Sequence, residues 1–107
     1  MPVAHATTSQ FRQDVEAIMS QLPDGMVTTY GDVAALAGHP YAARVVGGIA
    51  HHGNTELPWH RLVSRQGGLA KGYPGGMERQ RVQLEAEGIT CTAYVVNEFE
   101  KRRWKPL

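Results

Sequence analysis

Start and stop signals for two short helices, joined by a tight turn, dominate the first half of the sequence. Thr29 is a suitable N-cap, and Asp32 three positions later resembles a capping box, so a helix should begin at Thr29. Gly38 should end that helix, because glycine adopts the left-handed conformation of a C-terminal cap without strain. Pro40 suits the first turn of a further helix over about residues 41–51. Two short helices joined by a glycine-containing turn predict a helix-turn-helix.

Apolar spacing predicts two further helices. Apolar residues recur every three or four positions before Pro23, which indicates a helix over about residues 9–21. A second helix should run over about residues 77–87 and end at Gly88. The chain is therefore expected to be mainly α.

Strand signals are confined to short segments. Residues 61–70 should form a β-hairpin around a turn at residues 64–67, and residues 92–96 should be extended. At 107 residues the chain fits one domain, residues 1–107, with one modest core. We predict a mainly α fold, a winged helix-turn-helix domain with a short β-hairpin.

Positive charge is concentrated away from the first helix, although the net charge is only +1. Residues 1–38 carry one arginine and four acids, a net −3, whereas residues 39–75 carry four basic residues and one glutamate, a net +3. Further positive charge gathers near the C-terminal end, at Lys101, Arg102, Arg103 and Lys105. A polyanion would meet the middle and the tail of the chain. A solvated charged surface is the alternative, and charge alone does not separate the two.

The sequence shows no feature of a secreted or membrane protein. One cysteine, Cys91, excludes an intramolecular disulfide and suits a reducing environment. No apolar run approaches the length that spans a bilayer, and no signal-peptide pattern opens the chain. We expect a soluble cytoplasmic protein that does not contact a membrane.

The expected helix over residues 41–51 is rich in alanine and glycine and carries one arginine, Arg44. A helix that reads base edges in the major groove needs long polar side chains. Small residues instead suit a shallow approach to the minor groove, where one projecting cation can enter the base stack. Tight packing inside the protein is the alternative explanation, and both can hold on opposite faces of the helix.

Four segments, in order along the chain, resemble the C-terminal domain of O6-alkylguanine-DNA alkyltransferases. They cover most of residues 11–88 and read VTTYGDVA (27–34), ARVVGG (43–48), PWHRLV (58–63) and GYPGG (72–76), the last followed by Glu87-Gly88. The enzymes of this family place a nucleophilic cysteine between the proline and the histidine of the third segment, and this chain has Trp59 there. Because an indole is no nucleophile for displacement at an alkyl ether, the chain resembles the alkyltransferase-like proteins, which bind alkylated DNA without transferring the alkyl group.

Cys91 is an unsuitable replacement for that nucleophile. It lies outside the motifs, and its sequence neighbours include no histidine or lysine that would lower the pKa of its thiol. A cysteine in such a stretch usually behaves as a small buried apolar residue.

The resemblance assigns roles to individual residues. It implies that Arg44 fills the gap left by a flipped nucleotide and that Tyr30 presses on the phosphate 3′ to it. Trp59 would form the floor of the lesion pocket, with Tyr73 and Pro74 in its wall. The alternatives are a surface ion pair for Arg44 and core positions for Tyr30 and Trp59. Further DNA contacts are expected from Thr29, Ala43, Gly47, Gly48 and Lys71.

Other motif residues either differ from those that the enzymes have or keep their identity without the catalytic role. His60 and Glu87 should survive as a hydrogen-bonded pair with no thiol to deprotonate. Pro74 stands where the enzymes commonly have a serine that can contact O6, which would suit a pocket for varied adducts. The loop after Arg44 is shorter than in the enzymes, so whether Asn54 is the family's hinge asparagine stays open.

Together these features predict a protein that recognises DNA damage without catalysis. It should bind duplex DNA containing O6-alkylguanine through the minor groove, flip the lesion beside Trp59 and mark it for nucleotide excision repair proteins. No cofactor and no metal is expected, and the protein should be a monomer. The alternatives are an active alkyltransferase with another nucleophile and a helix-turn-helix regulator that recognises sequence.

Overall fold

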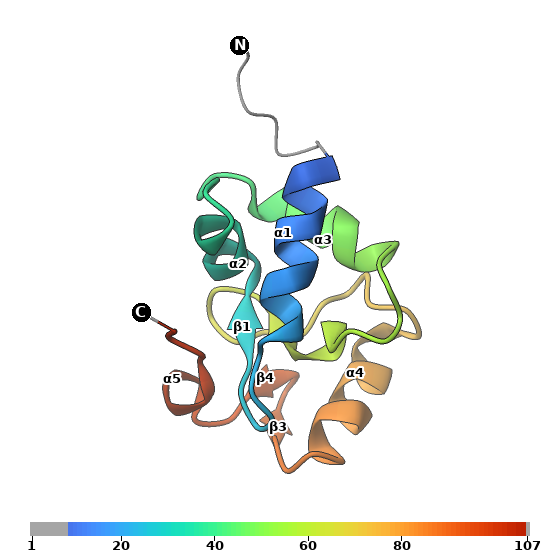
Figure 1. Cartoon of the computed structure of the whole chain (residues 1–107). Coiled ribbons are helices and arrows are strands. Elements are labelled where there is room, and N and C mark those ends of the chain that lie inside the picture. Colours follow the sequence, from blue (N-terminus) through green and yellow to red (C-terminus); the bar gives the residue numbers. More distant parts are fainter. Residues whose placement is uncertain (1–8, 107) are drawn as a thin grey trace.

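Helices form most of the regular structure in the computed structural model, which describes residues 9–106 (Figure 1). The helices are α1 (Ser9–Ser20), α2 (Tyr30–Leu36), α3 (Ala43–His51), the 3-10 helix η1 (Trp59–Arg61), α4 (Gly76–Glu85) and α5 (Phe99–Arg102). The strands, each of two residues, are β1 (Thr28–Thr29), β2 (Leu62–Val63), β3 (Cys91–Thr92) and β4 (Val95–Val96). The predicted mainly α fold with a short hairpin is confirmed. The two ends of the expected domain, residues 1–8 and 107, lie outside the described residues.

The predicted helix-turn-helix is present as α2 and α3. The Thr29 hydroxyl accepts a hydrogen bond from the Asp32 backbone N–H at 3.0 Å, which confirms the predicted N-cap. Gly38 has a φ of +90°, and the His39 N–H beyond it donates to the Ala34 carbonyl at 2.9 Å, as a C-terminal cap requires. The start predicted for α3, at residue 41, is two residues early. The Ala42 N–H closes a turn on the His39 carbonyl, and the helix begins only at Ala43.

The hairpin predicted over residues 61–70 is wrong in its pairing. The turn itself forms, since the Gly67 N–H donates to the Ser64 carbonyl at 2.8 Å. However, β2 pairs in parallel with β1, in the register Thr28↔Leu62 and Thr29↔Val63. The antiparallel hairpin of this fold is β3–β4, which also bridges to Gly68. Pairing with segments distant in sequence therefore overrides the local signal.

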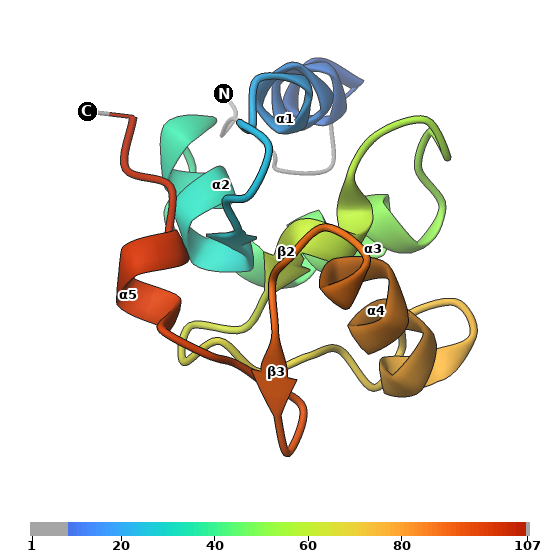
Figure 2. The same ribbon diagram turned by 90° about the horizontal axis from the view of Figure 1, so that it is seen from below.

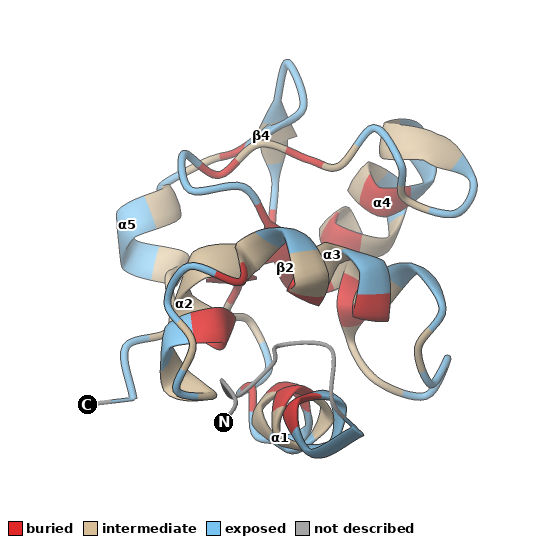
Figure 3. Cartoon of the chain, turned by 90° about the horizontal axis from the view of Figure 1, so that it is seen from above, coloured by how far each residue is buried: buried red, intermediate tan, exposed pale blue. Residues whose placement is uncertain are grey.

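Strand β2 separates two hydrophobic clusters. Successive side chains of a strand point to opposite faces, so Leu62 enters one cluster and Val63 the other. The first cluster joins α1, α2, α3 and η1, and the second joins Val27, which precedes β1, to β2, α4 and the residues around β3–β4. Figure 3 shows the buried side of α1 facing the interior and the tip of the β3–β4 hairpin exposed.

Two C-terminal features close the molecule. The helix α4 is followed by Gly88, where the Ile89 N–H donates to the Leu84 carbonyl at 3.0 Å and turns the chain into β3. The tail beyond β4 forms α5 and then returns to β1, where the Trp104 N–H donates to the Val27 carbonyl at 2.8 Å. Seen from below, α4 and α5 lie on opposite sides of the strands (Figure 2). Within residues 9–106 no helix combines the length and the apolar character that crossing a bilayer requires.

Candidate nucleic-acid interface

A cavity of about 610 Å³ opens between α3, η1 and the loop over residues 70–76. It brings together four segments that the sequence motifs had singled out: the start of α2, the middle of α3, the residues around η1 and the glycine-rich loop. Of the predicted pocket residues, four line it, namely Tyr30, Trp59, Tyr73 and Pro74.

Trp59 belongs both to the cavity wall and to the first hydrophobic cluster. Only 8% of its surface is exposed, and its indole Nε1–H donates to the Asn54 carbonyl at 2.7 Å. Trp59 therefore has the core position considered for it and also lines the cavity. One part of the ring packs in the core, while another part is left for an occupant of the cavity.

Gly53 allows Trp59 to lie where it does, and sequence reasoning had not singled it out. A Cβ at this position would lie 2.7 Å from Trp59 Cζ2 and 2.8 Å from the Ile49 carbonyl oxygen. Both distances are too short for a side chain, so only glycine fits. The neighbouring Asn54 holds the loop, because its side-chain oxygen accepts the Glu56 N–H at 2.9 Å.

Two tyrosines line the cavity, Tyr30 from the start of α2 and Tyr73 from the glycine-rich loop. Burial raises the pKa of Tyr30, whose ring lies over Gly47 of α3, where an added Cβ would be 3.7 Å from Tyr30 Cε1. Burial also raises the pKa of Tyr73, whose hydroxyl donates to the side-chain oxygen of Gln83 on α4. Both phenols therefore stay neutral and act as apolar rings with a polar tip.

The outer face of α3 is exposed, and its inner face is buried. Arg44 and Gly48 are exposed and Gly47 is half-buried, whereas Val46 and Ile49 are buried against the core. The inner face of this helix is thus packed inside the protein, and its outer face is accessible to the predicted contact with DNA. Arg44 does not line the cavity, but it lies one turn before Gly47, which does, and so stands beside the opening.

Three other residues predicted to contact DNA differ in accessibility. Lys71 is exposed on the glycine-rich loop, and Ala43 is half-buried at the start of α3. Thr29 is 2% exposed and its hydroxyl caps α2, so its side chain is not available to a phosphate. It positions Tyr30 instead.

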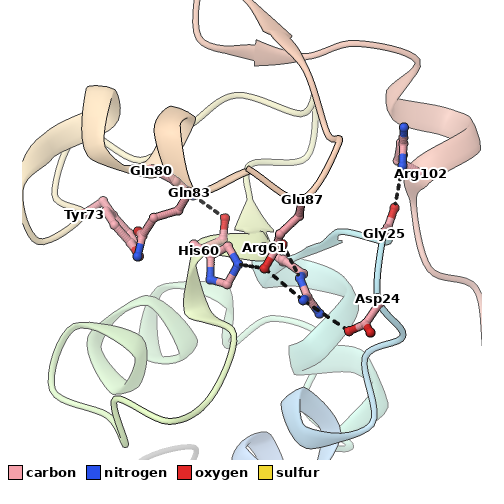
Figure 4. A network of polar contacts seen from close by, with 9 residues as sticks. All are labelled: Asp24, Gly25, His60, Arg61, Tyr73, Gln80, Gln83, Glu87 and Arg102. Atoms are coloured by element: carbon pink, nitrogen blue, oxygen red, sulfur yellow. Dashed lines mark hydrogen bonds and ion pairs between the residues drawn. The ribbon is translucent and has the colours of Figure 1, made fainter. Parts of the chain in front are cut away.

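His60 and Glu87 are in contact, as expected, but a third residue dominates the pair (Figure 4). His60 Nε2 lies 2.9 Å from a Glu87 carboxylate oxygen. Arg61 donates to both oxygens of the same carboxylate, at 2.9 and 3.2 Å, and also reaches Asp24 at 3.4 Å. The Arg61 hydrogen bonds, followed by that of His60, hold the pKa of Glu87 below its ordinary value. The carboxylate is thus committed to holding the end of α4 against η1.

Sequence reasoning missed Arg61 and Gln80 in this network. Arg61 was counted among the charges available to a polyanion, yet it is 8% exposed and already paired. Gln80 is fully buried, and its amide donates to the carbonyls of His60 and Leu62 at 3.1 Å each and accepts the Ala70 N–H at 2.8 Å. A polar residue on the inner face of α4 was the available signal.

Two arginines of the basic C-terminal tail, residues 101–105, already bind other parts of the protein. Arg102 donates to the carbonyls of Gly25 and Gly88, at 3.0 Å each, and Arg103 forms a fork with the Asp32 carboxylate at 2.8 Å in each arm. The expectation that the whole tail meets a polyanion is therefore corrected, since Arg103 fixes the tail to α2 and Arg102 fixes it to the backbone at Gly25 and Gly88.

Cys91 lies in β3 and does not line the cavity. Burial raises the pKa of its thiol, and Glu85 acts in the same direction. This shift opposes formation of a thiolate, the form that attacks an alkyl group.

Comparisons with known proteins place this geometry in a family. Residues 10–89 match the model of the 6-O-methylguanine DNA methyltransferase, DNA binding domain. The chain is 45% identical over 97 residues to the DNA base-flipping protein of Escherichia coli K12, covering 88% of this chain and 74% of that protein. It is 34% identical over 104 residues to alkyltransferase-like protein 1 of Schizosaccharomyces pombe, covering 91% and 96%.

A solved structure supports the same assignment. The crystal structure of S. pombe Atl1 in complex with damaged DNA containing O6-carboxymethylguanine matches with a TM-score of 0.80 at 32% identity, over 92% of this chain and 98% of that one. The chain therefore belongs to the 6-O-methylguanine DNA methyltransferase family, through its DNA-binding domain, and its relatives include a DNA base-flipping protein and an alkyltransferase-like protein.

Proposed function

We propose that the chain binds duplex DNA carrying an O6-alkylated guanine, holds the damaged nucleotide in the cavity beside Trp59 and leaves the alkyl group in place. The observation that carries the proposal is that the wall of the cavity has an indole at the position of the family cysteine. The names of the relatives, a DNA base-flipping protein and an alkyltransferase-like protein, support it, as does the complex of Atl1 with O6-carboxymethylguanine.

The size and lining of the cavity suit a single base. Its volume of about 610 Å³ lies within the range of small-molecule sites, roughly 300–1,000 Å³. Turning a base out of the duplex costs a few kcal/mol, and less for a pair already weakened by O6 alkylation. Contact with an aromatic ring returns about 1–3 kcal/mol per base. The net free energy of flipping the base and binding it therefore favours a damaged guanine over an intact one.

Docking on DNA is assigned to the outer face of α3. Its small residues permit a close approach to the minor groove, and the exposed Arg44 would fill the space vacated by the everted nucleotide. Tyr30, whose ring lies over Gly47, would press on the neighbouring phosphate, and Lys71 would approach the backbone from the glycine-rich loop.

The consequence in the cell is a marked lesion. A protein that holds an adduct without removing it needs a second activity to complete repair. From the family resemblance we propose that nucleotide excision repair proteins supply it, on DNA in the cytoplasm. The protein acts as a monomer and without a cofactor in this proposal.

A titration of matched short duplexes tests the proposal. One duplex carries guanine and the other O6-methylguanine, at one near-physiological salt concentration because phosphate contacts depend on salt. We expect tighter binding to the lesion. Arg44→Ala and Trp59→Phe should reduce that preference, whereas Arg65→Ala, in an exposed turn outside the cavity, should not. Thermal unfolding of each variant separates lost binding from lost fold. Equal binding of the wild type to both duplexes would refute lesion recognition.

A further inference from the structure

Arg79 places a positive charge at the wall of the cavity, and no sequence motif had drawn attention to it. It lies in the first turn of α4, and its side chain folds back over Gly75, which has a φ of +88°. A Cβ at Gly75 would lie 2.4 Å from Arg79 Cδ and 3.1 Å from Arg79 Cβ. Because Gly75 has no side chain, the arginine stem can lie on the loop and point its guanidinium along the cavity wall.

The charge of Arg79 is unmatched among residues 9–106. Its guanidinium makes one long hydrogen bond, to the Pro74 carbonyl at 3.4 Å, and forms no ion pair with a described carboxylate. Arg81 on the same helix differs, because it pairs with both Glu78 and Glu85. The guanidinium of Arg79 therefore remains available to an external partner.

The other charged side chains around the cavity do not offset this charge. Arg61 is neutralised by Glu87 and Asp24, and His60 contacts the same Glu87. Glu56 lines the cavity from the loop before η1 and is not paired with Arg79. Arg79 is thus the unpaired arginine of the described cavity lining.

Beside Arg79, the cavity-lining residues of the glycine-rich loop offer no free side-chain donor. The Tyr73 hydroxyl already donates to Gln83, Pro74 has no side-chain donor, and Gly72 has no side chain. Gln83 of α4 also lines the cavity, but its amide is neutral, so Arg79 is the charged donor that an adduct oxygen on this side would meet. A guanidinium presents paired N–H donors that match a carboxylate.

We propose that Arg79 is a specificity-determining residue that pairs with a carboxylate on the O6 substituent and so favours anionic O6 adducts over neutral adducts of the same size. The inference rests on the proposed function and names the class of adduct. A backbone phosphate beside the everted nucleotide offers the same oxyanion chemistry, so the test separates the two sources.

The test measures the affinity of wild type, Arg79→Gln and Arg79→Lys for four matched duplexes at one salt concentration. They carry guanine, O6-methylguanine, O6-carboxymethylguanine or its neutral amide isostere, O6-carbamoylmethylguanine. We expect Arg79→Gln to weaken binding to the carboxymethyl duplex roughly tenfold, the effect of one charge-assisted contact, and to change the other three less than about twofold. Arg79→Lys should retain part of the preference. Arg65→Gln, which removes an equal charge outside the cavity, should affect the four duplexes alike.

Two results overturn the inference. An equal loss on all four duplexes would assign Arg79 to a backbone phosphate, and no loss on any of them would remove it from the interface. Failure of the proposed function itself would show differently, as equal binding of the wild type to guanine and to O6-methylguanine.

Discussion

Trp59 is held in the cavity wall by its neighbours in the preceding loop. The Asn54 carbonyl accepts the indole N–H, and the bare backbone at Gly53 leaves room for the ring. A residue that reads a flipped base must itself be fixed, because a mobile ring would lose rotamer entropy on binding. The loop over residues 53–57 is thus part of the binding site, although only its backbone holds Trp59.

Gly53→Ala should displace Trp59. The added methyl group overlaps the indole and the Ile49 carbonyl, so we expect a loss of about 1–3 kcal/mol in the free energy of unfolding and weaker binding to the lesion. Chemical denaturation and duplex titration measure the two effects. Gly31→Ala is the matched control, because an added Cβ there meets nothing within 4 Å and should stabilise α2. Unchanged stability and binding in Gly53→Ala would show that the ring is free to move.

Thr28 carries a buried hydroxyl without a hydrogen-bond partner in the described structure. Thr28→Val keeps the shape and removes the unsatisfied group, so it should raise the free energy of unfolding by about 1 kcal/mol. Thr28→Ser, which keeps the hydroxyl and loses the methyl group, should lower it. The midpoint of denaturant unfolding checks both, and a loss of stability in the valine variant would contradict the assignment.

The elements differ in how far their own residues specify them. Helices α1, α2 and α4 follow from apolar spacing, the Thr29 cap and Gly88, all of which act within a few residues. The strands do not, because β2 pairs with β1 more than thirty residues earlier, a partner that no local pattern identifies. The four segments of the motifs supply about half of the residues that line the cavity, and the rest come mainly from the loop before η1 and from α4. Arg61, Gln80 and Arg79 were missed because their roles depend on partners that only the tertiary fold brings near.

The β3–β4 hairpin turns through two residues that both have positive φ, Ala93 at 52° and Tyr94 at 60°. Such a type I′ turn favours asparagine followed by glycine, and alanine in the left-handed region costs about 1–2 kcal/mol. Ala93→Asn should therefore raise the thermal midpoint, with a gain of about 1 kcal/mol. The β-branched variant Ala93→Val should lower it. If both variants unfolded at the wild-type temperature, the turn would be unstrained.

At the scale of the whole molecule, ion pairs join segments that are distant in sequence, Arg103 of the tail to Asp32 of α2 and Arg61 of η1 to Glu87 beyond α4. The Arg103 hydrogen bonds lower the pKa of Asp32, and those of Arg61 lower the pKa of Glu87. A carboxyl whose pKa is lowered by folding stabilises the fold above its ordinary pKa, 3.8 for aspartate and 4.5 for glutamate. That stabilisation is lost as the pH falls through the lower values of the folded state.

Stability should therefore decrease as the pH falls below about 4.5. Asp32→Asn should be less stable than the wild type at pH 7 and should show a shallower decrease toward pH 3, since one of the linked carboxyls is gone. Denaturant unfolding at a series of pH values measures both. Parallel pH profiles for the variant and the wild type would show that the Asp32–Arg103 pair is not linked to folding.

The central claim is that the protein holds an alkylated base and leaves it unchanged. The most direct measurement is the mass of the protein and the base composition of the DNA after prolonged incubation with excess duplex containing O6-methylguanine. We predict an unchanged protein mass and full recovery of O6-methylguanine from a complex that has demonstrably formed. A gain of one methyl group on the protein, with matching loss from the DNA, would show that the chain is an alkyltransferase with a nucleophile other than the missing cysteine.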